Sequence, residues 1–188
     1  LRDSHAMIRT ATAAVIFFGT LAAPTAHASE TRSAHAHEHG HGTLNIAIEE
    51  NRILMELEIP GADIVGFEHE PKSDSDKAAV EAAEEKLKDS DALFRFNGTA
   101  CRFEEAHLED HHEEHAKDES HDHEEGEHSE FHVAYELSCD DTSRISGMTF
   151  PFFAAFPNSE ELEVTIIGTS GQFHYEVERD EPNIFLKK

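Results

Sequence analysis

The chain has few basic residues, and it has no apolar run long enough to cross a membrane. Lysine and arginine number 15 against 40 aspartate and glutamate residues, so the formal charge is −25 at pH 7 with histidine neutral. A chain this acidic is repelled by nucleic acid and by anionic membrane surfaces, and it concentrates cations around itself. We therefore expect no nucleic-acid partner and no membrane insertion of the mature chain.

The sequence also lacks the short motifs of common enzyme classes. It contains no Gly-x-Ser-x-Gly, phosphate-loop or dinucleotide motif. His111-His112-Glu113-Glu114-His115 does match the His-x-x-Glu-His pattern of inverted zinc peptidases. Such peptidases need this pattern on a buried helix, whereas here no apolar periodicity surrounds it and the segment is so rich in histidine and glutamate that chance matches are expected. We predict that the protein is not an enzyme.

The first 28 residues have the pattern of an export signal. Arg9 follows Met7, an apolar run extends from Val15 to Leu21, and the small-x-small sequence of residues 26–28 is typical of a signal-peptidase site. We interpret residues 1–6 as upstream sequence and residues 7–28 as a cleaved signal peptide, and no cysteine follows that could carry a lipid anchor. Cleavage changes the formal charge from −25 to −26, because two arginines and one aspartate are removed. This predicts a periplasmic protein.

Only two cysteines occur, Cys101 and Cys139. In an oxidising compartment, a lone pair of cysteines most simply forms one disulfide. Closing a loop of this length contributes about 4 kcal/mol in the chain-entropy relation. The alternative is a pair of thiolate metal ligands, which would need protection from oxidation.

The apolar pattern predicts a single β-rich domain over residues 43–188, preceded by a flexible tail over residues 29–42. Apolar residues alternate with polar ones from Leu44 to Ile59 around an Asn51-Arg52 turn, and again from residue 162 to 177 around Ser170-Gly171. Alternation of this kind indicates two hairpins. We expect a mainly β (α+β), antiparallel sandwich-like domain, with a long disordered insert rich in histidine and acidic residues at 104–130.

Other segments fill in this expected domain. Residues 75–89 have the composition of one surface helix, capped by Ser75 or Asp76. Residues 99–103 and 131–139 read as paired strands that the disulfide would join, with the insert at their other end. The phenylalanines of residues 150–156 are expected in the core, since exposing them would favour aggregation.

Histidines are concentrated in the tail and the insert. Neutral imidazole is a good ligand for Zn²⁺, Cu²⁺ and Ni²⁺, and carboxylates complete such sites. Flexible chains rich in both predict several exchangeable ions of moderate affinity rather than one permanent site. His132, at the base of the insert, is the best placed of the remaining histidines, whereas His69 and His174 are expected to be ordinary surface residues. The candidate metal ligands are His35, His37, His39, His41, His107, His111, His112, His115, His121, His123, His128 and His132.

The histidine tracts have other possible explanations besides zinc binding. Solubility explains the acidic residues but not the crowding of histidine, and an expression tag would be a consecutive run. Histidine could also sense pH, because it titrates near neutrality. Among metals, copper(I) is disfavoured because Met55 and Met148 are the only methionines after residue 28. Copper(II) and nickel(II) remain alternatives to zinc.

The most specific block of the sequence is Ile59-Pro60-Gly61-Ala62-Asp63-Ile64-Val65-Gly66-Phe67-Glu68-His69-Glu70-Pro71, and the segments around residues 37–40, 130–139 and 156–164 agree with it. Together these blocks resemble the ZrgA-like family of zinc-regulated periplasmic proteins. The resemblance covers essentially the whole mature chain. It implies a zinc-binding component of an uptake system in Gram-negative bacteria, with inner-membrane metal transport proteins as partners. The alternatives are a passive periplasmic metal buffer and an acidic interaction module.

Overall fold

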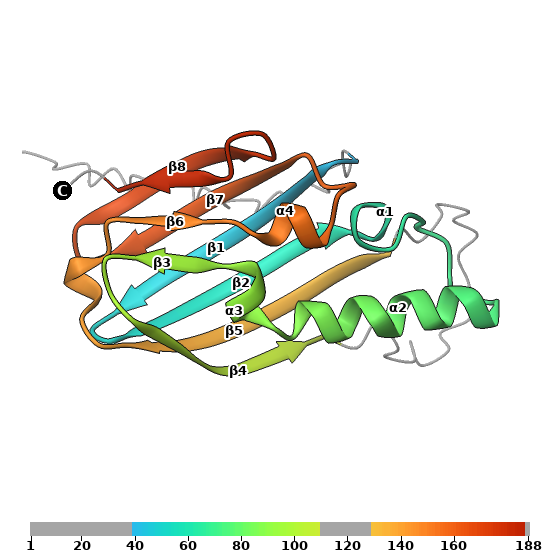
Figure 1. The fold of residues 1–188 in the computed structure, drawn as a ribbon, viewed down its shortest axis with the longest axis horizontal. Helices are drawn as coiled ribbons and strands as arrows, with labels where there is room; N and C mark the ends of the chain where they lie inside the picture. The colour runs from blue at the N-terminus through green and yellow to red at the C-terminus, as the bar shows by residue number, and fades with distance from the viewer. Residues whose placement is uncertain (1–38, 110–128, 187–188) are drawn as a thin grey trace, which may run out of the picture. The chain divides into compact units, whose positions relative to one another are not determined.

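The computed structural model describes residues 39–109 and 129–186. Its strands and helices follow the chain in an order that begins and ends with β-structure (Figure 1). The elements are β1 (His41–Glu49), β2 (Arg52–Pro60), α1 (Gly61–Ile64), α2 (Asp74–Leu87), α3 (Ser90–Leu93), β3 (Arg95–Asn97), β4 (Cys101–Leu108), β5 (Glu130–Cys139), η1 (Thr142–Arg144), β6 (Gly147–Thr149), α4 (Phe152–Ala155), β7 (Glu161–Gly168), β8 (Gly171–Glu178) and β9 (Asn183–Phe185).

Six strands form the main sheet, in the order β4-β5-β2-β1-β7-β8. Both predicted hairpins are confirmed as β1–β2 and β7–β8. The first turn lies at Glu50 and Asn51 rather than at Asn51-Arg52, and Glu50 takes a left-handed φ of 51° there. β1 and β7 pair in parallel, so the sheet is mixed although its other pairs are antiparallel.

A small second sheet, in the order β3-β6-β9, and helices α2, α3 and α4 cover one side of the main sheet (Figure 1). The core between these layers holds the inward side chains of β1, β2, β5 and β7. The predicted core phenylalanines are confirmed, since Phe150, Phe152, Phe153 and Phe156 are all buried. The fold is therefore mainly β and sandwich-like, as the alternation predicted.

The predicted helix is α2, with its start moved toward the N-terminus. Ser73, and not Ser75 or Asp76, is its N-cap: the Ser73 hydroxyl accepts from the Asp76 N–H at 3.1 Å, and the Asp76 carboxylate accepts from the Ser73 N–H at 3.2 Å. The Ser73 hydroxyl also lowers the pKa of Asp76. Ala83 and Leu87 are buried, so one side of α2 packs against the core. Three helices of four residues were not predicted.

The predicted disulfide is present between Cys101 and Cys139, which lie opposite each other in β4 and β5. The strands around it extend further than expected. Residues 104–108 continue β4 and Glu130 begins β5, so the ends of the predicted insert are strand. The predicted flexible tail is likewise too long, because β1 begins at His41.

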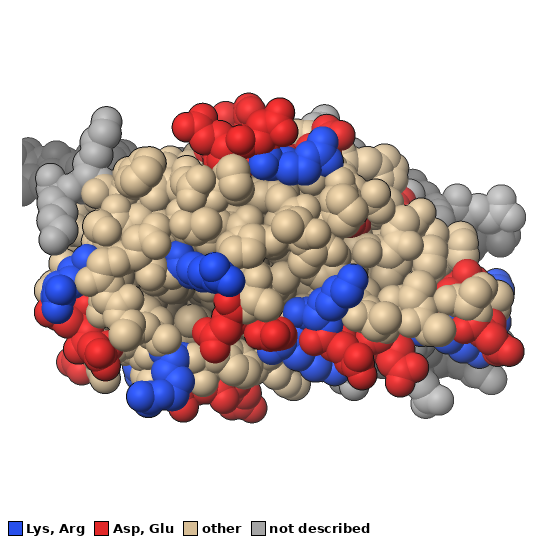
Figure 2. Space-filling model, viewed as in Figure 1, with Lys and Arg blue, Asp and Glu red and all other residues tan. Residues whose placement is uncertain are grey.

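No helix among the described residues is long and apolar enough to cross a membrane. On the side that carries the small sheet, the upper middle of the surface is largely uncharged, whereas acidic and basic side chains lie across its lower part and along its margins (Figure 2). Glu56, Glu58 and Glu163 alternate along their strands with buried residues and therefore point away from the core.

Candidate metal-binding site

The N-terminal histidine tract joins the domain at a tightly held glycine. Gly40 has φ +90°, which favours glycine, and its carbonyl accepts from the N–H groups of Glu160 and Glu161 at 2.8 Å each. Its own N–H donates to the Asp63 Oδ1 atom at 2.8 Å. The backbone between His39 and His41 is thus fixed to both α1 and the start of β7.

The histidine-rich insert returns to the domain at the same place. The Gly61 N–H donates to the Ser129 carbonyl at 2.7 Å, and the Ser129 N–H donates to the Glu68 carbonyl at 3.3 Å. A β-carbon at Gly61 would lie 2.2 Å from the Ser129 Oγ atom, so only glycine allows this approach. Residues 61–68, which we call the junction segment, therefore hold the ends of both histidine tracts.

Asp63 is the buried centre of this junction. Only 2% of its surface is exposed, and while its Oδ1 atom accepts from Gly40, its Oδ2 atom has no hydrogen-bond partner among the described residues. Burial raises the pKa of Asp63, and the Gly40 N–H and the nearby His39 and His41 side chains oppose this shift. A buried carboxylate with an unsatisfied oxygen is unfavourable unless positive charge lies close to it.

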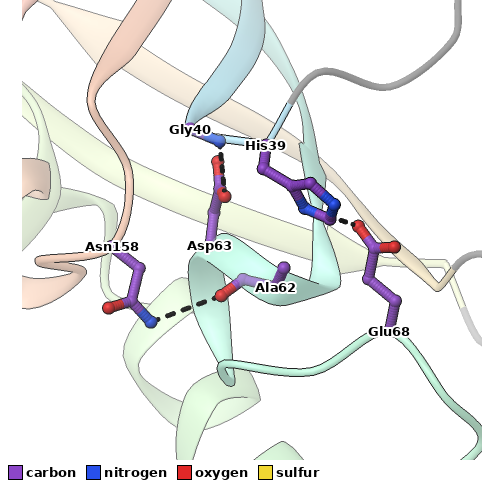
Figure 3. A network of polar contacts seen from close by, with 6 residues as sticks. All are labelled: His39, Gly40, Ala62, Asp63, Glu68 and Asn158. Atoms are coloured by element: carbon purple, nitrogen blue, oxygen red, sulfur yellow. Dashed lines mark hydrogen bonds and ion pairs between the residues drawn. The ribbon is translucent and has the colours of Figure 1, made fainter.

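His39 and Glu68 face each other beside the Gly40–Asp63 hydrogen bond. The Nδ1 atom of His39 lies 3.2 Å from the Oε1 atom of Glu68, as Figure 3 shows beside the Gly40–Asp63 hydrogen bond. The His39 side chain is 68% exposed and that of Glu68 is 15% exposed, so the carboxylate is held while the imidazole can be reached by an ion from solvent. The Asn158 side-chain N–H also donates to the Ala62 carbonyl at 3.3 Å, which ties the junction to the loop before β7.

Two other predicted ligands are paired with carboxylates. His41 Nδ1 lies 3.6 Å from Glu161 Oε1. His132 Nε2 lies 3.4 Å from Glu130 Oε2, and its Nδ1 lies 3.8 Å from Glu58 Oε1. The two nitrogens of the His132 ring thus face different carboxylates, and the three groups do not point at one ion.

The remaining described histidines are not grouped with the others. His107 is exposed on β4, opposite Ala134. His69 stacks on the Phe67 ring with centroids 4.6 Å apart, and His174 lies near Thr165 on the exposed edge strand β8. Across residues 39–109 and 129–186, no three histidine, cysteine, aspartate or glutamate side chains converge to hold a metal ion. The described part of the chain therefore offers pairs of ligands and no complete site.

Most of the predicted metal ligands lie outside the described residues. The possible peptidase motif at residues 111–115 lies there as well. The predicted ligands outside the described residues are His35, His37, His111, His112, His115, His121, His123 and His128.

The carboxylate partners were missed by sequence reasoning. Glu68 and Asp63 lie in the block that carried the family resemblance, but nothing in the local pattern shows that Asp63 is buried and bonded to Gly40. Glu161 and Glu58 belong to alternating strands, where acidic residues on the outer face are ordinary. The usable signal was the pair of glycines in Gly61–Gly66, which indicates a tight fold-back.

A comparison with protein families places this architecture. The family model of ZrgA family zinc uptake proteins matches residues 36–186. The chain belongs to the ZrgA family. This ZrgA protein accordingly has a role in zinc uptake, and its match includes the junction segment, the disulfide and both β-hairpins. A search of curated proteins gives no match.

Proposed function

We propose that this ZrgA-family protein captures Zn²⁺ in the periplasm of a Gram-negative bacterium and supplies it to inner-membrane zinc transport proteins. The observation that carries the proposal is the attachment of both histidine tracts to one junction segment, in a chain that belongs to a zinc uptake family. The proposed role is binding and transfer, and it requires no catalytic residue.

The chemistry of the tracts supports capture. Imidazole and carboxylate are the ligands that zinc takes from proteins, and the acidic chain raises the local concentration of cations. The His39–Glu68 and His41–Glu161 pairs each supply one imidazole and one carboxylate. An ion held by two protein ligands keeps open positions, so an acceptor can bind it before it is released. This property suits transfer better than a closed site of four protein ligands.

A zinc titration tests capture. The metal-stripped chain from residue 29 onward is titrated with Zn²⁺ against a chromophoric chelator, beside a variant in which a Gly-Ser linker replaces residues 110–128. We expect several ions in the first protein and a loss of most of them in the variant. Undiminished binding would mean that the zinc sites lie in the tail and the folded domain. Parallel titrations with Cu²⁺ and Ni²⁺ test selectivity, because the usual affinity order favours copper over zinc.

Growth tests the delivery step. A strain lacking the protein should grow poorly when zinc is scarce, and the wild-type gene should restore growth while a gene without the signal segment should not. Normal growth at low zinc with failure in excess metal would contradict delivery and support a passive buffer. The mass of the secreted protein checks export, since we expect its N-terminus at Ser29.

A further inference from the structure

We propose that His39 and Glu68 are the two fixed ligands of one ordered Zn²⁺ site, which Asp63 positions and stabilises through Gly40. The inference rests on the proposed zinc binding and deepens it, because it distinguishes one ion from the exchangeable ions of the tracts. Nothing in the composition of the tracts requires such a site.

The spacing of the two ligand atoms fits a shared ion. Zinc binds imidazole nitrogen and carboxylate oxygen at about 2.0–2.2 Å with tetrahedral angles, which places the two atoms about 3.4 Å apart. In the structure, His39 Nδ1 and Glu68 Oε1 are 3.2 Å apart. An ion can therefore replace the direct contact between the two side chains with a small movement of the exposed imidazole. The other coordination positions stay open to water or to exchanging ligands.

The junction holds this pair before any metal arrives. His39 is followed by Gly40, whose N–H and carbonyl groups are both bonded to the domain. Glu68 is held from the other side, because its carbonyl accepts from Ser129. Ligands that are fixed in advance lose less conformational freedom on binding than ligands from a flexible tract, so this pair should bind the first ion.

The buried carboxylate beside the pair is the second observation that points to a cation (Figure 3). Among the described residues, the Oδ2 atom of Asp63 has no hydrogen-bond partner although it is buried. The side chains of His39 and His41 lie near enough to shift the pKa of Asp63 downward, so a cation held at His39 would act on the same carboxylate. The His41–Glu161 and His132–Glu130 pairs have similar spacing, but their carboxylates are more exposed than that of Glu68.

Amide NMR of the metal-stripped chain from residue 29 onward tests the site directly. With one equivalent of Zn²⁺, we expect the Gly40 and Ala62 resonances to shift before those of the other histidine-bearing strands. The variants H39Q and E68Q should each lose one equivalent in the competitive titration, and the double variant should lose no more than either. The matched controls H174Q and E70Q should keep the full number, since neither residue belongs to the junction.

A third variant separates positioning from ligation. D63N keeps an oxygen for the Gly40 N–H but removes the charge, so we expect the full number of ions with the first bound ~10–100-fold more weakly, as for other residues that support metal ligands. Thermal unfolding in chelator confirms that each variant folds. Zinc binding that is normal in wild type and unchanged in H39Q and E68Q would overturn this inference alone, whereas a wild-type chain without zinc affinity would overturn the proposed function.

Discussion

Replacing residues 110–128 by a short linker should leave the domain intact and slightly more stable. The ends of this deletion come from the structure: the Glu109 N–H still donates to the His132 carbonyl, and Ser129 keeps its bonds to Gly61 and Glu68. A cut at 104–130, as the composition of the chain suggests, would instead remove most of β4 and the first residue of β5. It would unfold the edge of the sheet for reasons unrelated to metal.

Two entropy terms set the size of the effect. The composition of the insert predicts that it has no fold of its own. Shortening it to about six residues then reduces the entropic free-energy cost of closing this loop by about 1 kcal/mol. The same deletion shortens the disulfide loop, whose sequence separation is 38. That change reduces the disulfide's stabilising effect by about 0.4 kcal/mol. The net expectation is a gain of roughly 0.6 kcal/mol, before any relief of repulsion between the acidic residues.

Urea unfolding of both proteins in chelator, with the disulfide intact, measures this difference. The zinc titration on the same samples shows whether capacity falls while stability does not. A loss of more than about 2 kcal/mol would refute the reasoning, because it would mean that the insert packs on the domain and contributes to its core. A matched linker in the β7–β8 turn, where residues 169–170 connect the strands, shows what a linker alone does.

Three further predictions concern the residues that hold the junction and the sheet together. Reducing the Cys101–Cys139 disulfide should lower the free energy of unfolding in urea by about 4 kcal/mol and leave zinc stoichiometry unchanged; lost zinc would instead implicate thiolates. Gly61→Ala should destabilise by about 1–3 kcal/mol, and Ser129→Gly should relieve part of this in a double-mutant cycle, because the new β-carbon meets the Ser129 hydroxyl. Burial raises the pKa of Asp63 above its ordinary 3.8. Its contribution to stability is therefore present below that value and lost as pH rises through the folded pKa, so wild type should lose stability relative to Asp63→Asn over that range; a constant difference between the urea curves would refute the raised pKa.

Local patterns were sufficient for the hairpins and insufficient for the strand pairs that join them. β1–β2 and β7–β8 each alternate around a short turn, which is visible in the chain itself. The parallel pairing of Leu44 with Val164 joins strands that are far apart in sequence, and no local period encodes it. The extent of β4 was missed because Glu104 and Glu105 are polar and the register shifts between Phe103 and Glu105. An exposed edge strand made of such residues has the same composition as the insert beside it, so composition does not show where the strand ends.

The candidate site was predictable in its histidines and not in its carboxylates. His39, His41 and His132 stand out because histidine is crowded around them. Glu68 becomes a partner of His39 only because Gly61 and Gly66 fold the chain back over the start of β1. Asp63 looked like any polar loop residue, and its burial depends on Gly40 and on the loop before β7. Metal chemistry can thus be predicted from composition, whereas the arrangement that orders it requires the tertiary fold.

The shared junction also bears on how the two tracts cooperate. Because Gly40 and Ser129 are both bonded to residues 61–68, ligands close to either attachment point start near the same carboxylates. A second ligand tethered near a bound ion acts at a high effective concentration, and this advantage falls as the attachment points move apart. Had the tracts joined opposite ends of the sheet, each would bind alone. Under the proposed function, their common attachment would favour ions that pass between tracts, with the His39–Glu68 pair as the fixed point of exchange.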